Sequence, residues 1–372
     1  MSVLLLVNPD FEEQLLYALG QRRTDHYIVR RCADLTELLA TASAGVGGAA
    51  LIDGDRESLS LTAVKELQSL GLQVGLIGGK QPAQYLRNMS AQVISPSEAV
   101  AWIESVGELE RPSAPAPASG SGVIVAVWGP PGSHGRSTIA RELARLSGGV
   151  VVDLDLVAPS LAQMCAVEES SALVAFARNV EKGRDVEAAA DLLVETDSSG
   201  TRVIAGLNSA ARWREISAPV VEKIVETLRM RESWIFLDLA GGFSGSDAMR
   251  DRWNVTRRVI EGSDVVLHVS SASVLGIRRL LEHIDLYTPG EEGVIVVNQV
   301  RSSSVGHDPS GQISRLLVPV RLPSILIRDD AAKCDAALLR GESIVQRAPK
   351  SAASKDIVRL WEFVRDEMIG GR

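Results

Sequence analysis

The sequence has few aromatic residues, few cysteines and no long apolar run. These shortages argue against a core of large aromatic side chains, a cysteine metal site and a membrane-spanning helix. Aromatic side chains make up 4% of the 372 residues, so the 45% hydrophobic share consists mainly of small and branched residues, which suit α/β layers. Cys32, Cys165 and Cys334 lie far apart and fit no metal-ligand spacing, which predicts buried thiols in a reducing compartment. No apolar run approaches the roughly 20 residues that span a bilayer.

Positive charge is also scarce. The formal net charge of −8 argues against a surface that coats nucleic acid. Residues 1–14, MSVLLLVNPDFEEQ, combine a short apolar run with acidic residues and lack a basic segment and a cleavage site. We interpret them as a first strand rather than a signal peptide, and we expect a cytoplasmic protein.

Composition divides the chain into two regions of alternating strands and helices. Residues 108–122 are rich in Pro, Ala, Ser and Gly, which predicts a linker between a domain at 1–107 and a domain at 123–372. The first domain is expected to contain strands at 3–7, 27–30, 49–52, 73–77 and 92–94. In the second, strands are expected at 123–128, 150–152, 202–205, 234–237, 265–269, 294–297 and 324–327. The pattern predicts two α/β doubly wound, mostly parallel sheets, covered on both faces.

The first region resembles a response-regulator receiver domain. Asp53 ends the third expected strand, where such a domain carries its phosphoacceptor. The acidic pair after the first strand is replaced by Asn8 and Pro9, and Ser95 stands where a lysine would follow the fifth strand. A phosphoaspartate needs a metal and a lysine to offset its charge. We therefore expect a pseudo-receiver, a docking or dimerisation module in which Asp53 is an ordinary strand-end carboxylate.

The main chemical signal is the stretch VIVAVWGPPGSHGRSTIARELARL, a strand, a glycine loop and a helix. Backbone N–H groups of such a loop and helix surround a phosphate, and Gly132 and Gly135 let the chain turn tightly there. Arg136 stands where a lysine is expected, with a bulkier and less adjustable fork. Ser137 is placed to ligate Mg²⁺, and Thr138 to cap or line the helix start. Taken alone, the loop is also explained as a simple Gly/Pro turn.

Three later strand ends carry polar side chains. Asp153 and Asp155 follow a buried run, and their spacing places both carboxylates on one strand face, near a metal or an attacking water. Asp238 ends WIFLD in a Walker B-like arrangement, whose carboxylate holds Mg²⁺. Asn298 closes VIVVN, where its amide can read an adenine edge. Each position is also explained as a polar residue that closes a strand, but their order behind the loop favours function.

Together these elements resemble the MinD/ParA group of deviant-Walker P-loop ATPases, and in particular the CpaE/TadZ type of pilus-assembly and septum-site systems, which place a degenerate receiver first. The resemblance implies ATP and Mg²⁺ as ligands, a homodimer, and a protein partner in a pilus, secretion or division assembly. By position, it implies a phosphate loop of Gly132, Ser133, His134, Gly135, Arg136, Ser137 and Thr138. It places Ser137, Asp153 and Asp238 at the metal, Asp155 and Arg136 in catalysis, and Asn298 and Asp329 beside the base.

Four departures from the family pattern affect the chemistry. Pro131 occupies the position of the signature lysine, Ser133 that of the second loop glycine, Arg136 that of the loop lysine, and Ala240 that of the proline after the Walker B aspartate. We therefore expect nucleotide binding, and hydrolysis stays open and slow if present. A non-hydrolysing scaffold with a vestigial loop is the alternative, and a DNA-partitioning ATPase is disfavoured by the acidic balance.

Two further segments could form surfaces. Residues 356–369 are amphipathic, with Ile357, Leu360, Trp361 and Val364 on one face. Acidic residues in this segment weaken attraction to anionic lipid, so packing on the sheet is favoured over membrane anchoring. Arginines at 250, 252, 257 and 258 are interrupted by acidic residues, which indicates a solvated helix face. Polar or membrane-peripheral placement is accordingly expected only through partners.

Overall fold

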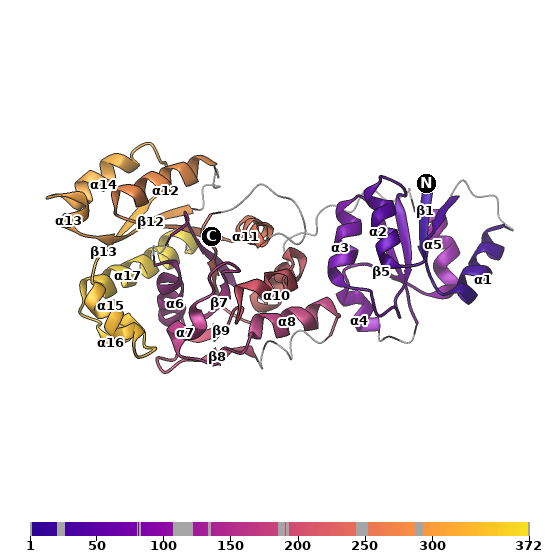
Figure 1. Ribbon diagram of the computed structural model, residues 1–372, viewed down its shortest axis with the longest axis horizontal. Helices are drawn as coiled ribbons and strands as arrows, with labels where there is room; N and C mark the ends of the chain where they lie inside the picture. Colours follow the sequence, from indigo (N-terminus) through magenta and orange to yellow (C-terminus); the bar gives the residue numbers. More distant parts are fainter. Residues whose placement is uncertain are drawn as a thin grey trace. The chain divides into compact units, whose positions relative to one another are not determined.

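The computed structural model describes residues 2–20, 27–79, 81, 83–106, 122–132, 135–184, 190, 193–242, 252–286 and 293–370. It contains two compact units, each built on its own sheet (Figure 1). The first comprises Met1–Ala118 and Ala177–Val186, and the second comprises Ser119–Phe176 and Glu187–Arg372. The linker predicted at 108–122 lies outside the described residues, apart from Gly122.

The first unit holds a five-stranded parallel sheet in the order β2-β1-β3-β4-β5, the flavodoxin-like doubly wound order. Its strands are β1 (Ser2–Leu6), β2 (Tyr27–Arg31), β3 (Ala49–Asp53), β4 (Gln73–Ile77) and β5 (Gln92–Ile94). The helices between and after them are α1 (Pro9–Gly20), α2 (Leu35–Ser43), α3 (Leu61–Ser69), α4 (Ala83–Asn88) and α5 (Ala99–Ser105). The predicted βα alternation is confirmed.

Three positions that matter for a receiver domain take part in local turns and caps. Asp53 Oδ1 accepts the Asp55 N–H at 2.9 Å. Asn8 Oδ1 accepts the Asp10 N–H at 3.0 Å. Ser95 forms a capping box with the residue three positions later, which starts the turn before α5. These groups therefore have local structural uses that need no phosphoryl chemistry.

The second unit holds an eight-stranded sheet in the order β13-β12-β11-β6-β10-β7-β9-β8. Its strands are β6 (Val123–Trp128), β7 (Val150–Leu154), β8 (Glu195–Thr196), β9 (Arg202–Ile204), β10 (Trp234–Leu239), β11 (Val265–Ser271), β12 (Gly293–Val300) and β13 (Ser324–Arg328). Among these described strands, only the β8–β9 pair is antiparallel. Strand β6 lies inside the sheet, between β11 and β10. The loop that follows β6 therefore lies at the carboxyl edge of the sheet, where doubly wound folds bind their ligands.

Helices cover both faces of this sheet. The helices of this unit are α6 (Arg136–Ser147), α7 (Leu161–Cys165), α10 (Ala218–Arg229), α11 (Arg252–Glu261), α12 (Val274–Leu286), α13 (Ser302–Val305), α14 (Pro309–Leu317), α15 (Ala331–Leu338), α16 (Ile344–Arg347) and α17 (Ala352–Phe363), and α8 (Ala172–Glu181) begins in this unit and ends in the first. Val294 and Val296 of β12 join the core that includes α6 and α17, which lie side by side in Figure 1. Ile295 and Val297 join the core under α12 and α14. Because strand side chains alternate, these two cores occupy opposite faces.

The C-terminal amphipathic segment packs into the core beside α6. Ile357, Leu360 and Val364 are buried there, and the Trp361 ring packs edge-on against Trp234 with 4.6 Å between ring centroids. The favoured interpretation of this segment, packing on the sheet, is thus confirmed. No helix in the described part of the chain is long and apolar enough to cross a membrane.

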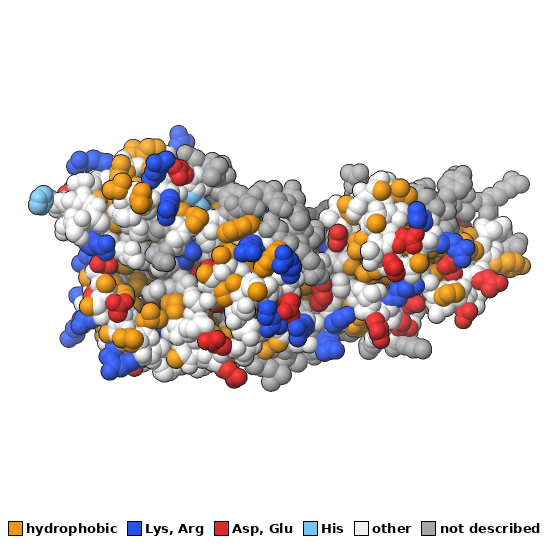
Figure 2. Space-filling model, in the orientation of Figure 1, with side chains coloured by type: hydrophobic (Ala, Val, Ile, Leu, Met, Phe, Trp, Pro, Cys, Tyr) orange, Lys and Arg blue, Asp and Glu red, His pale blue; other side chains and the backbone are white. Residues whose placement is uncertain are grey.

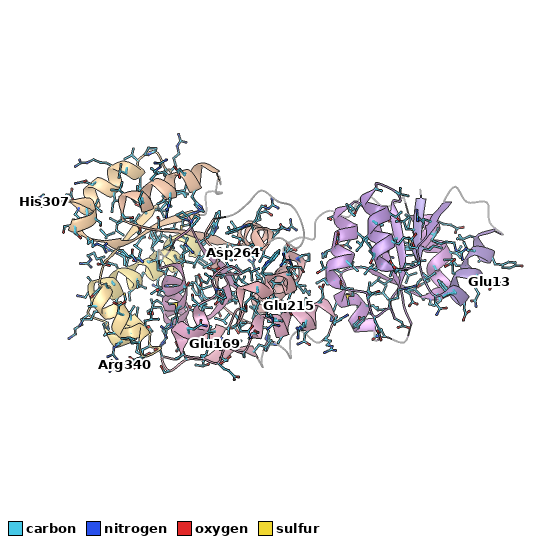
Figure 3. The ribbon with its side chains drawn as sticks, in the orientation of Figure 1. Glu13, Glu169, Glu215, Asp264, His307 and Arg340 are labelled. Carbon is cyan, nitrogen blue, oxygen red and sulfur yellow. The ribbon has the colours of Figure 1, made fainter. Side chains whose placement is uncertain are left out.

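The amino-terminal end of β6 is fixed by a charged residue. Asp264, labelled in Figure 3, accepts the Ile124 N–H at 2.9 Å and forms an ion pair with Arg229 of α10 at 2.9 Å. The carboxylate thereby joins the start of the internal strand to a covering helix. A fixed strand also fixes the loop at its other end, where the candidate site lies.

Candidate functional site

The glycine loop lies between β6 and α6 at the carboxyl edge of the sheet. Gly132 and Gly135 have φ angles of 131° and 84°, in the region that favours glycine. Gly135 is the N-cap of α6, and a Cβ atom there would overlap the Asn298 side-chain amide. A helix N-terminus at this edge is an arrangement that binds anions. The predicted phosphate-loop residues Ser133 and His134 lie outside the described residues.

Arg136 joins two loops through their backbone carbonyl groups. Its Nη1 donates to the carbonyl oxygens of Pro130 and Gly132, both at 3.0 Å. Its Nε donates to the carbonyl oxygen of Leu239, at the end of β10, at 3.2 Å. Three carbonyls around one planar fork form a geometry that a lysine ammonium cannot reproduce. The arginine therefore connects the glycine loop to the end of β10.

Asp238 is a buried carboxylate on β10, the strand that pairs with β6 beside this loop. It follows Phe236 by two residues on β10, so both side chains face α6. The side chain is fully buried, and within the described part of the chain no group meets the distance and angle of a hydrogen bond to either carboxylate oxygen, although the Ser137 hydroxyl lies near enough to act on its charge. Burial raises the pKa of Asp238 well above its ordinary value, and the Asp153 charge raises it further, against the opposing effects of the Ser137 hydroxyl and the Arg136 charge.

An unsatisfied buried carboxylate is costly, and a bound cation removes that cost. Asp238 and the Ser137 hydroxyl are oxygen ligands of the kind Mg²⁺ prefers. Among the described residues, no three His, Cys, Asp or Glu side chains form a metal-holding group. Mg²⁺ typically completes its coordination shell with waters and phosphate oxygens, so these two side chains fit a nucleotide-bound Mg²⁺.

Asp153 and Asp155 shape the loop that follows β7. Asp153 Oδ2 accepts the N–H groups of Ser160 and Leu161, both at 3.0 Å, and its Oδ1 accepts the Asp155 N–H at 3.2 Å. Burial raises the pKa of Asp153 to about 7, and the neighbouring Asp155 charge adds to the rise while the backbone donors oppose it. Asp155 Oδ1 in turn accepts the Ala158 N–H at 2.7 Å. The two carboxylates hold the loop against the site.

This loop also reaches the phosphate loop directly. The Ser160 hydroxyl donates to the Ser137 hydroxyl oxygen at 3.3 Å. Thr138, the next residue of α6, is partly buried. In addition, β7 and β10 pair with Asp153 opposite Asp238. The structure thus brings together the predicted metal residues Ser137, Asp153 and Asp238.

The two predicted base-binding residues have other contacts. The Asn298 amide lies against Gly135 of the phosphate loop. Asp329 forms an ion pair with Arg301 at 3.3 Å, and its N–H donates to the Val300 carbonyl oxygen at 3.0 Å. Asn298 therefore supports the loop, whereas Asp329 stabilises the end of β12.

Sequence inspection missed a buried aromatic cluster behind the loop. Trp128, the last residue of β6, packs against His283 of α12 with 4.1 Å between ring centroids. His283 Nε2 lies 3.5 Å from His268 Nδ1 of β11. The Trp128 indole donates to the Gly242 carbonyl oxygen at 3.3 Å, which positions the turn after β10. Because the histidines lie 15 residues apart on different elements, no local pattern marks them.

A second missed group anchors the phosphate-loop helix. Arg141 of α6 pairs with Asp197 at 2.7 Å, and the two side chains are 3% and 0% exposed. Glu142 accepts the Ile344 and Val345 N–H groups, both at 3.1 Å. Two adjacent charged residues inside a helix are the available sequence signal, but their partners lie far away in the chain. The network fixes α6 relative to the C-terminal segments.

Comparisons with known proteins show which folds this one is similar to. No family model matches the chain, and no curated protein sequence matches it. The cell division ATPase MinD of Pyrococcus furiosus is similar in structure, with a TM-score of 0.51, 17% identity, and coverage of 66% of this chain and 99% of that chain. A ParA family ATPase of Chlorobium tepidum has a TM-score of 0.51 and 21% identity, with coverage of 64% and 97% respectively.

A third similar structure contains a nucleotide. The septum site-determining protein MinD of Pyrococcus horikoshii, complexed with Mg-ADP, has a TM-score of 0.51 and 14% identity, and the match covers 67% of this chain and 98% of that chain. Similarity at these identities shows the fold. The protein is an α/β protein with two compact units, and its fold is similar to that of these MinD and ParA structures.

Proposed function

We propose that the second unit binds ATP with Mg²⁺ and uses it as a slow switch in positioning a larger assembly, such as a pilus machine or a division site. The observation that carries the proposal is the glycine loop at the start of α6, near the buried Asp238 carboxylate, whose oxygens have no hydrogen-bond partner among the described residues. A metal–nucleotide complex requires an anion site beside a cation site.

Each part of the site has a defined use in this proposal. The loop N–H groups bind the phosphates, and Ser137 and Asp238 hold Mg²⁺, which neutralises phosphate charge. Asp153 fixes the loop after β7, and Asp155 orients a water near the phosphates. Arg136 is held by three backbone carbonyls, which leaves it poorly placed to follow a transition state and makes hydrolysis slow.

The first unit serves as a pseudo-receiver in this proposal. Its strand order is that of flavodoxin-like folds, and Asp53, Asn8 and Ser95 are engaged in turns and caps. A unit without phosphoryl chemistry can still dock a partner or dimerise. Nucleotide binding would then bias the chain between a free state and a dimeric or assembly-bound state.

The names of similar structures support a positioning role. Two of them are described as a cell division ATPase and a septum site-determining protein. We extend that role to this chain as a proposal, with a homodimer as the nucleotide-bound state and a protein of a pilus, secretion or division assembly as its partner. The protein would act in the cytoplasm, and at a pole or membrane through that partner.

Sedimentation velocity tests the switch. The wild-type chain should shift from monomer to dimer when Mg·ATP is added, and Asp238→Asn should not shift. Asp366→Asn, which removes an exposed carboxylate paired with Arg365, is the matched control and should behave as wild type. An oligomeric state that ignores nucleotide in all three proteins contradicts the switch.

A nucleotide-independent scaffold is the second candidate. The observation in its favour is that the Arg136 side chain itself joins the loop to the Leu239 carbonyl group. A constant oligomeric state, together with localisation that survives Asp238→Asn, would support this candidate over the switch.

The charged side chains on the surface of the second unit do not favour a DNA-partitioning role. Arg258 of α11 pairs with Glu222 at 2.7 Å and with Glu261 at 3.7 Å. On the face of the second unit seen in Figure 2, acidic and basic side chains are interspersed. Arg250, from the same predicted basic cluster, lies outside the described residues. DNA binding depends on unpaired cations, which release counterions from phosphate.

A further inference from the structure

The arginine inside the phosphate loop is committed to the protein backbone. Besides its three carbonyl acceptors, the Arg136 fork lies against Gly241, where a Cβ atom would come within 2.9 Å of both terminal nitrogens. A side chain packed in this way has little freedom to follow a ligand. Arg136 is therefore a positioning residue that holds the loop.

A second arginine reaches the same loop from a different helix. Arg279 lies on α12 and is exposed, and its Nη1 donates to the Pro131 carbonyl oxygen at 3.5 Å. In the part of the chain that the structure describes, this is its one hydrogen bond, and it forms no ion pair there. A hydrogen bond of this length is weak. The guanidinium can therefore exchange the carbonyl for a stronger acceptor.

A phosphate oxygen is such an acceptor. Arginine binds phosphate through short, charge-assisted and often bidentate hydrogen bonds. Among the described loop residues, Pro131 carries neither a charge nor an N–H donor, so its position supplies no group for a phosphate. We propose that Arg279 binds the terminal phosphate of the nucleotide, while Arg136 only positions the loop. This inference rests on the nucleotide binding proposed above.

The neighbouring residue provides a matched control. Arg278 is also exposed on α12, but its Nε donates to Glu282 at 2.9 Å in an i,i+4 ion pair. Arg278→Ala and Arg279→Ala thus remove the same side chain from adjacent positions of one helix. Only the second removes a group that touches the loop. Arg279→Lys keeps the charge and loses the fork.

The test is displacement of a fluorescent ATP analogue by ATP and by ADP, with Mg²⁺ present, for the full-length wild type and the three variants. Arg279→Ala should weaken ATP binding about tenfold or more, the size of a lost charge-assisted hydrogen bond, and should leave ADP binding within about twofold. Arg279→Lys should recover part of the ATP affinity. Arg278→Ala should match wild type, and circular dichroism should show all variants folded.

Three outcomes would overturn the inference. Wild-type ATP affinity in Arg279→Ala would show that the side chain does not bind phosphate. Equal losses for ATP and ADP, or an equal loss in Arg278→Ala, would remove the assignment to the terminal phosphate. If the wild-type chain binds neither nucleotide, the proposed function fails together with the inference, whereas the other outcomes leave nucleotide binding intact.

Discussion

The buried pair His268 and His283, behind the glycine loop, should make the free energy of unfolding fall at acid pH. Burial lowers the pKa of His268 to about 3, with the His283 charge adding to the shift. Burial lowers the pKa of His283 to about 4, and the Arg136 charge lowers it further. Both side chains are therefore neutral in the folded protein at neutral pH. Lowering the pH from 7.5 to 5 is the perturbation.

The sign follows from the unfolded chain, where a histidine has a pKa of about 6.5. Below that pH the histidines bind protons in the unfolded state but not in the folded state. The free energy of unfolding is therefore unaffected by them above about pH 6.5, and it falls as the pH is lowered toward the folded pKa values. At pH 5 each histidine costs about 2 kcal/mol, or about 4 kcal/mol for the pair. The raised pKa of Asp153, about 7, acts in the opposite direction, so a variant comparison is required.

Urea unfolding followed by tryptophan emission at pH 7.5 and pH 5 provides the assay. The wild-type chain should lose about 4 kcal/mol more stability between these pH values than a His268→Gln/His283→Gln variant. His307→Gln, at an exposed position labelled in Figure 3, is the control and should track the wild type. Equal pH dependence in the wild type and the double variant would refute the argument.

Three further predictions concern the second unit. Gly135→Ala places a Cβ atom at a φ of 84° and into the Asn298 amide, so nucleotide affinity should fall at least tenfold in calorimetry while circular dichroism changes little. Arg141→Met leaves Asp197 buried without its cation and should cost about 3–5 kcal/mol in urea unfolding; an effect under 1 kcal/mol would mean the pair is dispensable. Trp361→Ala should cost about 3–5 kcal/mol in the same assay, and sedimentation of the wild type with anionic liposomes would contradict the buried packing of this helix.

The positions of the strands, and of the polar residues at their ends, were predictable because both depend on the local sequence pattern. Apolar runs such as Val294–Val297 mark strands covered on both faces, and they occur as expected. Strand β8 was missed, because two residues, Glu195 and Thr196, carry no apolar signal. Its pairing with β9 is set by the antiparallel register.

Side-chain direction and long-range partners could not be read from the sequence. The bulge in β12, where Gln299 has a φ of 58°, coincides with Asn298 contacting the phosphate loop, and no sequence signal marks this bulge. Arg136 lies at the predicted position, but one of its three carbonyl acceptors is that of Leu239, which is 103 residues away in the chain. Arg279 contacts the loop from α12, and this contact forms only because the helix packs beside a loop 148 residues away in the chain. The residue types at the site were thus predictable, and their contacts were not.

Calorimetric titration of the full-length protein with Mg·ATP and Mg·ADP, beside the Gly135→Ala variant, measures directly whether the second unit binds a nucleotide. We expect the wild type to bind both nucleotides with micromolar affinity and the variant to bind them at least tenfold more weakly. Absence of binding at millimolar nucleotide would show that the glycine loop and the buried Asp238 carboxylate hold no metal–nucleotide complex.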